Sequence, residues 1–204
     1  MAAEEGGEKK NTDKYRAIIE AAIRVFGEHG YHNARVVKIA RAAGVAEGTV
    51  YLYFRNKEDL LVSAFREKMD EFTTRVEREL AGLGEAGAAE KLRRLVDMHL
   101  QRLGGDYTLA LFFQIHLRQP EDTVRTAIAG PLARYARVIE ALAEEGMAAG
   151  EFLPGQNKKL IRQMVFGAMD EVVSNWVRAR GKYSLPEQAG PVFAFLLRGL
   201  AGRS

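Results

Sequence analysis

Apolar residues recur along this chain at offsets of three and four, which is the spacing of one helix face, and no stretch of useful length alternates apolar with polar positions. Glycines and prolines separate these periodic segments. Because helices of this kind bury their apolar stripes against one another, the pattern predicts an all-α protein.

The first predicted helix begins near Thr12 or Asp13, residue types that favour a helix N-cap, and ends before Gly30. Residues 1–11 are polar, and we expect them to form a disordered tail. A long helix follows from Lys57 and breaks at the glycine-rich residues 82–87.

Further helical segments fill the second half of the chain. Pro120 stops one of them, and the last two are strongly apolar, with faces that look too wide for one neighbouring helix. The segments lie at 92–103, 109–118, 121–149, 157–180 and 185–200.

Residues 36–60, VVKIARAAGVAEGTVYLYFRNKEDL, have the pattern of a helix-turn-helix. In the first half, Val36, Ile39 and Ala40 share one helix face with Ala43. Gly44 ends this helix, because glycine can take the left-handed conformation that a tight turn requires.

The second short helix of this motif divides into an inner and an outer face. Val50 and Phe54 lie four residues apart on the side that should meet the first helix, so we expect both in the core. The outer face is small, hydroxylic or flat, which suits close approach to DNA bases and phosphates; it comprises Gly48, Thr49, Tyr51, Leu52 and Tyr53.

Positive charge is concentrated at this motif. The whole chain has a net charge of only +3. Residues 31–57 contain five cations and one acid, Glu47, so the net charge of this segment is five minus one, or +4. The cations are Arg35, Lys38, Arg41, Arg55 and Lys57. Such a patch supplies salt-dependent affinity for phosphates, to which base contacts add sequence discrimination.

The run GVAEGTVYLYFRNKEDL resembles the recognition end of TetR-type bacterial transcriptional repressors, and residues 12–60 show the resemblance. It implies a TetR-like fold of about nine helices, with a DNA-binding head over residues 12–56 and a ligand-binding, dimerising body over 57–204. It further implies that Thr49 and Leu52 line the recognition helix, that the Tyr51 and Tyr53 hydroxyls reach phosphates, and that Lys57 lies against the DNA backbone. Val36 stands where such repressors often have a capping threonine, which leaves Asn33 or Arg35 for that contact.

A second resemblance covers most of the chain. Tyr31-His32, the triplet at 117–119 and the spacing FGxxDE followed by Trp176 are similar to the fatty-acid-degradation regulators of the FadR type. This resemblance implies a repressor that long-chain acyl-coenzyme A (acyl-CoA) releases from its operator. The principal alternative is a TetR-type multidrug sensor that controls an efflux pump; an activator or a binding module without a DNA role also stays open.

The chain contains the residue types that an acyl-CoA site requires, which are apolar groups for the acyl chain and arginines for the phosphates. The apolar candidates are Met98, Leu103, Leu109, Phe112, Phe113, Met164 and Ala168. The polar candidates are Arg102, Arg118, Arg125, Arg134 and Gln114. At any one of these positions, ordinary core is the more common role of an apolar residue and solvated surface the more common role of an arginine.

Composition excludes several other functions. Zero cysteines and four scattered histidines argue against a metal site, and we expect no cofactor beyond the effector. No apolar run is long enough for a membrane span or a signal peptide, so we expect a cytoplasmic protein. No nucleophile or phosphate loop accompanies Asp170 and Glu171, so we expect no enzyme. The TetR resemblance implies a homodimer through the last two helices. A dimer also fits DNA binding, because paired heads about 34–36 Å apart read a two-fold operator.

Overall fold

The computed structural model describes residues 2–118 and 122–202, with side chains from Asn11 onward. Within these ranges the chain forms nine α-helices, one short 3-10 helix and no strand, which confirms the all-α prediction. Gln119, Pro120 and Glu121, where the sequence predicts a break between helices, lie outside the described residues.

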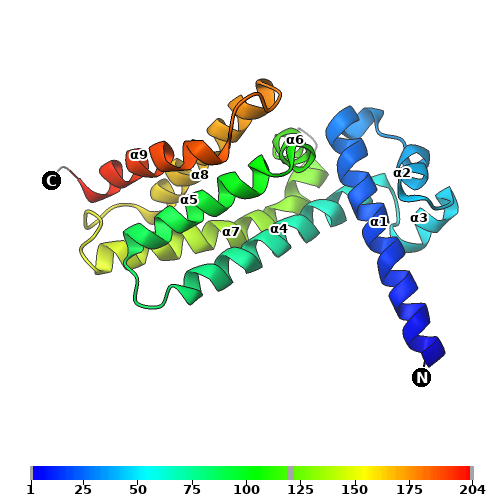
Figure 1. The fold of residues 1–204 in the computed structure, drawn as a ribbon, viewed down its shortest axis with the longest axis horizontal. Helices are drawn as coiled ribbons and strands as arrows, with labels where there is room; N and C mark the ends of the chain where they lie inside the picture. The colour runs from blue at the N-terminus through cyan, green and yellow to red at the C-terminus, as the bar shows by residue number, and fades with distance from the viewer. Residues whose placement is uncertain (1, 119–121, 203–204) are drawn as a thin grey trace. The chain divides into compact units, whose positions relative to one another are not determined.

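The helices belong to two compact units (Figure 1). Unit 1 consists of the residues up to Lys68 together with Leu111–Ile128, and unit 2 consists of Met69–Ala110 and the residues from Ala129 onward. The division between the units falls within α4 (Lys57–Gly82). Residue 57, where the sequence predicts the domain boundary, is the first residue of this helix. The domain boundary itself stays a prediction.

In unit 1, α1 (Ala2–Asn33) packs on α2 (Val36–Ala43), and α2 packs on α3 (Glu47–Tyr53). Each helix contributes its periodic apolar face to one small core, as the sequence predicts. The buried side chains include Ile18, Ile19, Phe26, Ile39, Val50, Phe54 and Leu60.

Helix α1 differs from the prediction at its start and agrees with it near its end. It begins at Ala2, whereas the sequence places a tail over residues 1–11. Alanine, glutamate and lysine fill most of that segment, and these are strong helix formers. Gly30 has φ 69° and ψ 172°, so the helical path breaks where the sequence predicts it.

The turn between α2 and α3 is closed by Gly44, which has the left-handed conformation (φ 68°, ψ 30°). The Val45 N–H donates to the Ala40 carbonyl at 3.0 Å, and the Gly44 N–H donates to the Arg41 carbonyl at 3.1 Å. These two bonds are the Schellman pattern, which satisfies carbonyls that a helix end leaves open. The helix-turn-helix therefore forms at the residues that the sequence predicts.

Helix α4 begins at a polar cap. The Asn56 Oδ1 accepts the Asp59 N–H at 2.8 Å, and the Asp59 carboxylate accepts the Arg55 N–H at 2.9 Å. The backbone hydrogen bond from Arg55 is the main reason that the pKa of Asp59 lies below its usual range. This cap fixes where the recognition helix ends and the long helix starts.

Unit 2 is built around α5 (Ala88–Gly104), which contacts α8 (Lys158–Arg178) and α9 (Ala189–Ala201); α8 and α9 also contact each other (Figure 1). The 3-10 helix η1 (Pro186–Gln188) precedes α9. Two further helices, α6 (Tyr107–His116) and α7 (Asp122–Ala148), contribute residues to both units. These bounds agree with the predicted segments to within a few residues.

Side chains cap two of the helices in unit 2. The Glu151 carboxylate accepts the N–H groups of Ala88 and Ala89, both at 2.9 Å, at the start of α5. The Asn157 Oδ1 accepts the Lys159 N–H at 2.9 Å at the start of α8. Both acceptors meet the positive end of a helix dipole, which favours these starts.

Candidate nucleic-acid interface and effector region

The recognition helix α3 has an exposed face and a buried face. Tyr51 is 50% and Leu52 is 82% exposed, whereas Val50 is 1% and Phe54 is 3% exposed. Thr49 and Tyr53 are half-buried at the border between these two faces. A Cβ atom added at Gly48 would meet nothing within 4 Å, so this side of α3 is open.

Exposed cations surround this open face. Arg35, Lys38 and Arg41 are exposed on α2 or immediately before it. Arg55 is exposed as well and forms an ion pair with Asp59 at 3.4 Å. An exposed pair of this kind contributes little to stability and can exchange its carboxylate for a phosphate.

Tyr53 is fixed by contacts with the first helix. Its ring lies 6.0 Å from the Tyr15 ring, and the Tyr15 ring stacks on Phe54 at 5.4 Å. The Tyr53 hydroxyl donates to Asn11, both to the backbone carbonyl at 3.2 Å and to Oδ1. The sequence predicts Asn11 within a tail and contains no signal for this contact, since the two residues are far apart in the chain.

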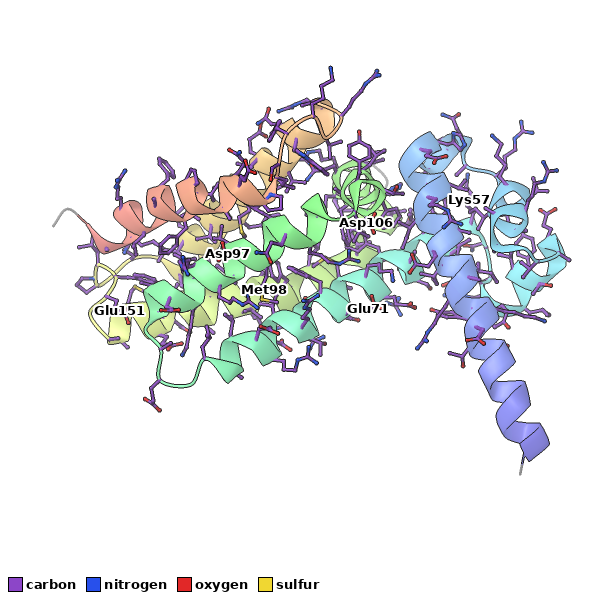
Figure 2. All side chains as sticks on the ribbon, in the orientation of Figure 1. Lys57, Glu71, Asp97, Met98, Asp106 and Glu151 are labelled. Carbon is purple, nitrogen blue, oxygen red and sulfur yellow. The ribbon has the colours of Figure 1, made fainter. Side chains whose placement is uncertain are left out.

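Lys57 stabilises the head itself (Figure 2). Its Nζ donates to the carbonyl oxygens of Tyr31, His32 and Ala34 at 2.9, 3.3 and 3.2 Å. The same ammonium lies 4.5 Å from the centroid of the Tyr31 ring. Three carbonyls use the three hydrogens of an ammonium, so the predicted phosphate contact would require one of these bonds to open.

The apolar effector candidates are mostly buried, but they belong to different units. Met98, Leu103 and Leu109 are buried in unit 2, and Figure 2 shows Met98 on α5. Phe112 and Phe113 are buried in unit 1, where Phe113 meets the Phe65 ring edge-on at 5.1 Å. Their assignment to an effector site stays a prediction.

The polar effector candidates all have partners within the chain. Arg134 bonds Glu77 at 2.5 Å and Asp70 at 3.5 Å, and the hydrogen bond with Glu77 raises its pKa above the usual value. The remaining pairs are Arg102 with Asp106 at 3.7 Å, Arg125 with Asp122 at 2.5 Å, and Arg118 with Gln114 at 2.7 Å. A coenzyme A phosphate would have to replace these partners.

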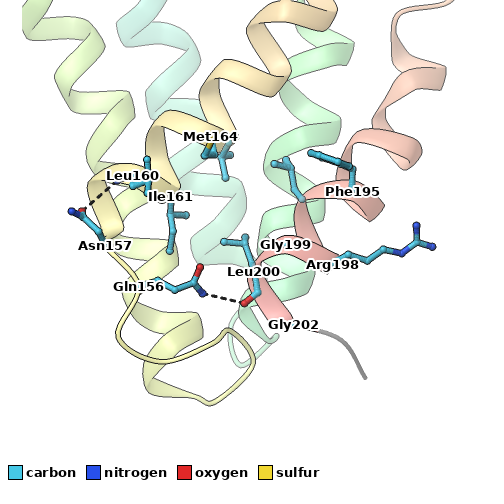
Figure 3. Close-up of a pocket in the computed structure, with 12 residues that line it drawn as sticks. Gln156, Asn157, Leu160, Ile161, Met164, Phe195, Arg198, Gly199, Leu200 and Gly202 are labelled. Atoms are coloured by element: carbon cyan, nitrogen blue, oxygen red, sulfur yellow. Dashed lines mark hydrogen bonds between the residues drawn. The ribbon is translucent and has the colours of Figure 1, made fainter.

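Met164 lies on the surface of unit 2, whereas the sequence predicts it as a lining residue for the acyl chain. It is 60% exposed and faces a groove of about 970 Å³ between α8 and α9 (Figure 3). Leu160 and Phe195 line the same groove and are 48% and 74% exposed. Ala168, one turn further along α8, is half-buried.

Unit 2 contains a buried pair of polar side chains from two helices. The His99 Nδ1 and the Tyr135 hydroxyl are 3.1 Å apart, and both side chains are buried. Burial lowers the pKa of His99 to about 4, and the charge of Asp170 offsets part of this effect. The sequence shows His99 within an apolar stripe but gives no signal for its partner, which comes from another helix.

Comparisons with known proteins agree with this arrangement. A family model described as "Bacterial regulatory proteins, tetR family" matches residues 18–64, and one described as "YsiA-like protein, C-terminal region" matches residues 65–199. The chain therefore belongs to the tetR family of bacterial regulatory proteins.

Within this family the chain is similar to the fatty acid metabolism regulator protein of Bacillus subtilis, with 42% identity over 94% of this chain and 98% of the relative. It also resembles the solved fatty acid degradation regulator FadR of Bacillus halodurans (45% identity, TM-score 0.86). The FadR of Bacillus subtilis in complex with stearoyl-CoA gives 42% identity and a TM-score of 0.87. Each of these two similarities covers 91% of this chain and 99% of the other.

Among the residues described, no helix combines the length and the apolar content that a membrane crossing requires.

Proposed function

We propose that this protein represses genes of fatty-acid degradation and that a long-chain acyl-CoA releases it from its operator. The observation that most strongly supports this proposal is the similarity, over nearly the full length of both chains, to a regulator solved with stearoyl-CoA. A repressor needs no reacting group, so the protein acts as a regulator and not as an enzyme. A bacterial regulator that binds DNA works in the cytoplasm.

DNA binding uses the open face of α3 and the cations beside it. Arg35 and Lys38 are exposed and contact phosphates, which positions the head on the duplex. Thr49 and Leu52 approach the bases in the major groove and add about 1–3 kcal/mol of discrimination for each good contact. The affinity therefore falls with salt, whereas the sequence preference depends on α3.

Effector binding uses the buried apolar side chains for the acyl chain and the arginines for coenzyme A. Arg102 and Arg134 now pair with carboxylates on partly exposed surfaces, and such pairs can exchange for phosphate oxygens. Bound effector favours an arrangement in which the two heads of a dimer no longer match successive major grooves. A coupling of about 1–3 kcal/mol between the two sites changes operator affinity by roughly 5–150-fold.

The dimer forms through α8 and α9. Their groove exposes Leu160, Met164 and Phe195, which are large apolar side chains of the kind that proteins cover at interfaces (Figure 3). A Cβ atom at Gly167 or Gly199 would meet nothing within 4 Å, so a second copy can approach closely there. Met164 then belongs to the dimer contact and not to the acyl site.

Operator binding and its release test the proposed function. The purified protein is titrated onto DNA from upstream of its own gene, with fluorescence anisotropy at fixed salt, and acyl-CoAs of increasing chain length are then added. We expect salt-sensitive binding that long-chain acyl-CoA weakens, whereas free coenzyme A does not. If acyl-CoAs leave operator affinity unchanged and flat aromatic cations weaken it, the protein is a drug sensor instead.

The dimer is tested with two matched substitutions of exposed apolar residues. Phe195→Glu places charges in the α8–α9 groove, and we expect a monomer by analytical ultracentrifugation with weakened operator binding. Leu52→Glu alters an equally exposed residue on α3, and we expect it to lose operator binding but to stay dimeric. A dimeric Phe195→Glu protein would contradict the proposed interface.

A further inference from the structure

The first helix contacts the recognition helix at the Tyr53 hydroxyl. The one hydrogen of this hydroxyl is shared between the backbone carbonyl and the Oδ1 of Asn11. The hydroxyl therefore has no further hydrogen to donate to a DNA phosphate while it keeps Asn11 as its partner. There are two alternatives. On DNA binding the Tyr53 hydroxyl breaks its bond with Asn11 and donates to a phosphate, or it keeps that bond and another group donates to the phosphate.

The packing around this contact favours the second possibility. The Tyr15 ring stacks on Phe54 at 5.4 Å and meets the Tyr53 ring at 6.0 Å, so this part of α1 is held against α3 at several points. Tyr53 is only half-buried, and Asn11 is exposed beside it. Breaking the bond with Asn11 would remove one of the contacts that hold the two helices together.

The Asn11 amide has the chemistry to bind a phosphate. Its Oδ1 accepts from Tyr53, and its Nδ2 has two hydrogens that take no part in that bond. Asparagine is among the side chains that donate to DNA phosphate oxygens. Lys14 is also exposed and lies three residues along α1, which places it next to Asn11 on the helix surface.

We propose that Asn11 and Lys14 form a second DNA-contacting element beside the recognition helix, in which Tyr53 positions the Asn11 amide to donate to a backbone phosphate and Lys14 contacts a phosphate nearby. This proposal rests on the proposed DNA-binding function. It gives Tyr53 a positioning role, in place of the direct phosphate contact that the family resemblance implies. It also extends the interface to residues before the helix-turn-helix.

A double-mutant cycle on operator affinity tests the Asn11 contact. We expect Asn11→Ala to weaken binding about tenfold or more per head, because a hydrogen bond to a charged acceptor is lost. Tyr53→Phe should weaken it less, and the double variant should bind no more weakly than Asn11→Ala, because Tyr53 acts through Asn11. Unchanged or tighter binding by Asn11→Ala would show instead that Asn11 competes with the phosphate for Tyr53.

Asn11→Asp provides a second measurement. This variant keeps an oxygen for the Tyr53 hydroxyl but replaces the amide donor with a negative charge. We therefore expect it to bind the operator more weakly than Asn11→Ala, with an unchanged thermal melting curve and an unchanged response to acyl-CoA. Binding at the wild-type level would overturn the proposal, since only the acceptor for Tyr53 would then matter.

The salt dependence tests Lys14. Lys14→Gln should reduce the slope of log Kobs against log salt by about 0.9 per head, the value for one lost phosphate contact. Arg16→Gln is the matched control, because Arg16 is exposed nearby on α1 but lies on a different side of the helix. Equal slopes for Lys14→Gln and the wild-type protein would contradict the Lys14 contact. Failure of the proposed function would appear already in the wild-type protein, which would not bind the operator.

Discussion

Protonation of the buried histidine of unit 2 should make stability depend on pH in a predictable way. His99 is 7% exposed, and its ring lies within 6.3 Å of the rings of Phe72, Tyr135 and Phe166. Burial lowers its pKa from 6.5 to about 4 in the folded protein, and the nearby charge of Asp170 only partly offsets this. The unfolded chain therefore binds the proton more tightly than the folded chain does.

The sign and size of the effect follow from this difference in proton binding. Between pH 6.5 and 4 the unfolded state holds more protons, so the free energy of unfolding falls as the pH falls through this window. The whole loss amounts to about 3 kcal/mol, and between roughly pH 7.5 and 5.5 it is about 1.3 kcal/mol.

Urea unfolding at these two pH values, followed by circular dichroism at one fixed protein concentration, measures the loss. His99→Gln removes the titrating ring but keeps a polar partner for Tyr135, and carboxylates common to both proteins cancel in the comparison. We expect the variant to lose about 1.3 kcal/mol less than the wild-type protein over this pH range. His29→Gln, which removes an exposed histidine on α1, is the composition-matched control. Equal losses for wild-type and His99→Gln would refute the reasoning.

Three further predictions concern the head. Lys57→Met removes the donor to three carbonyls, and we expect a loss of about 1–3 kcal/mol in the free energy of unfolding, measured by urea denaturation. Gly44→Ala introduces a Cβ at φ 68° and should cost about 1–2 kcal/mol in the same assay, although nothing within 4 Å would clash with it. Thr49→Ala should change which bases are preferred in an operator library while leaving the salt slope unchanged, and a uniform loss across all sequences would contradict a base contact.

Local patterns account for the parts of the fold that the sequence determines. Val36, Ile39 and Ala40 recur at helical spacing, and Gly44 supplies the one backbone conformation that ends their helix, so α2 and its turn appear at the predicted residues. The same reasoning correctly separates Val50 and Phe54 from the exposed face of α3. In each case the information lies within a few residues, because helix periodicity and capping are short-range properties.

Tertiary structure decides which polar groups meet, and the sequence offers no signal for those pairs. In the sequence, Lys57 is one of several cations near the predicted DNA-binding helix. In the structure, its ammonium donates to three carbonyls at and just after the end of α1. Asn11 and Tyr53, like His99 and Tyr135, are far apart in the chain and become partners only when separate helices pack. Met164 has the spacing of a core residue, yet it is exposed. Helical spacing indicates which residues share a face but not whether another helix of the same chain covers that face. Periodicity and turn residues determine that this chain is helical and where its helix-turn-helix lies. The side-chain partners depend on contacts across long stretches of sequence, which local propensity does not encode.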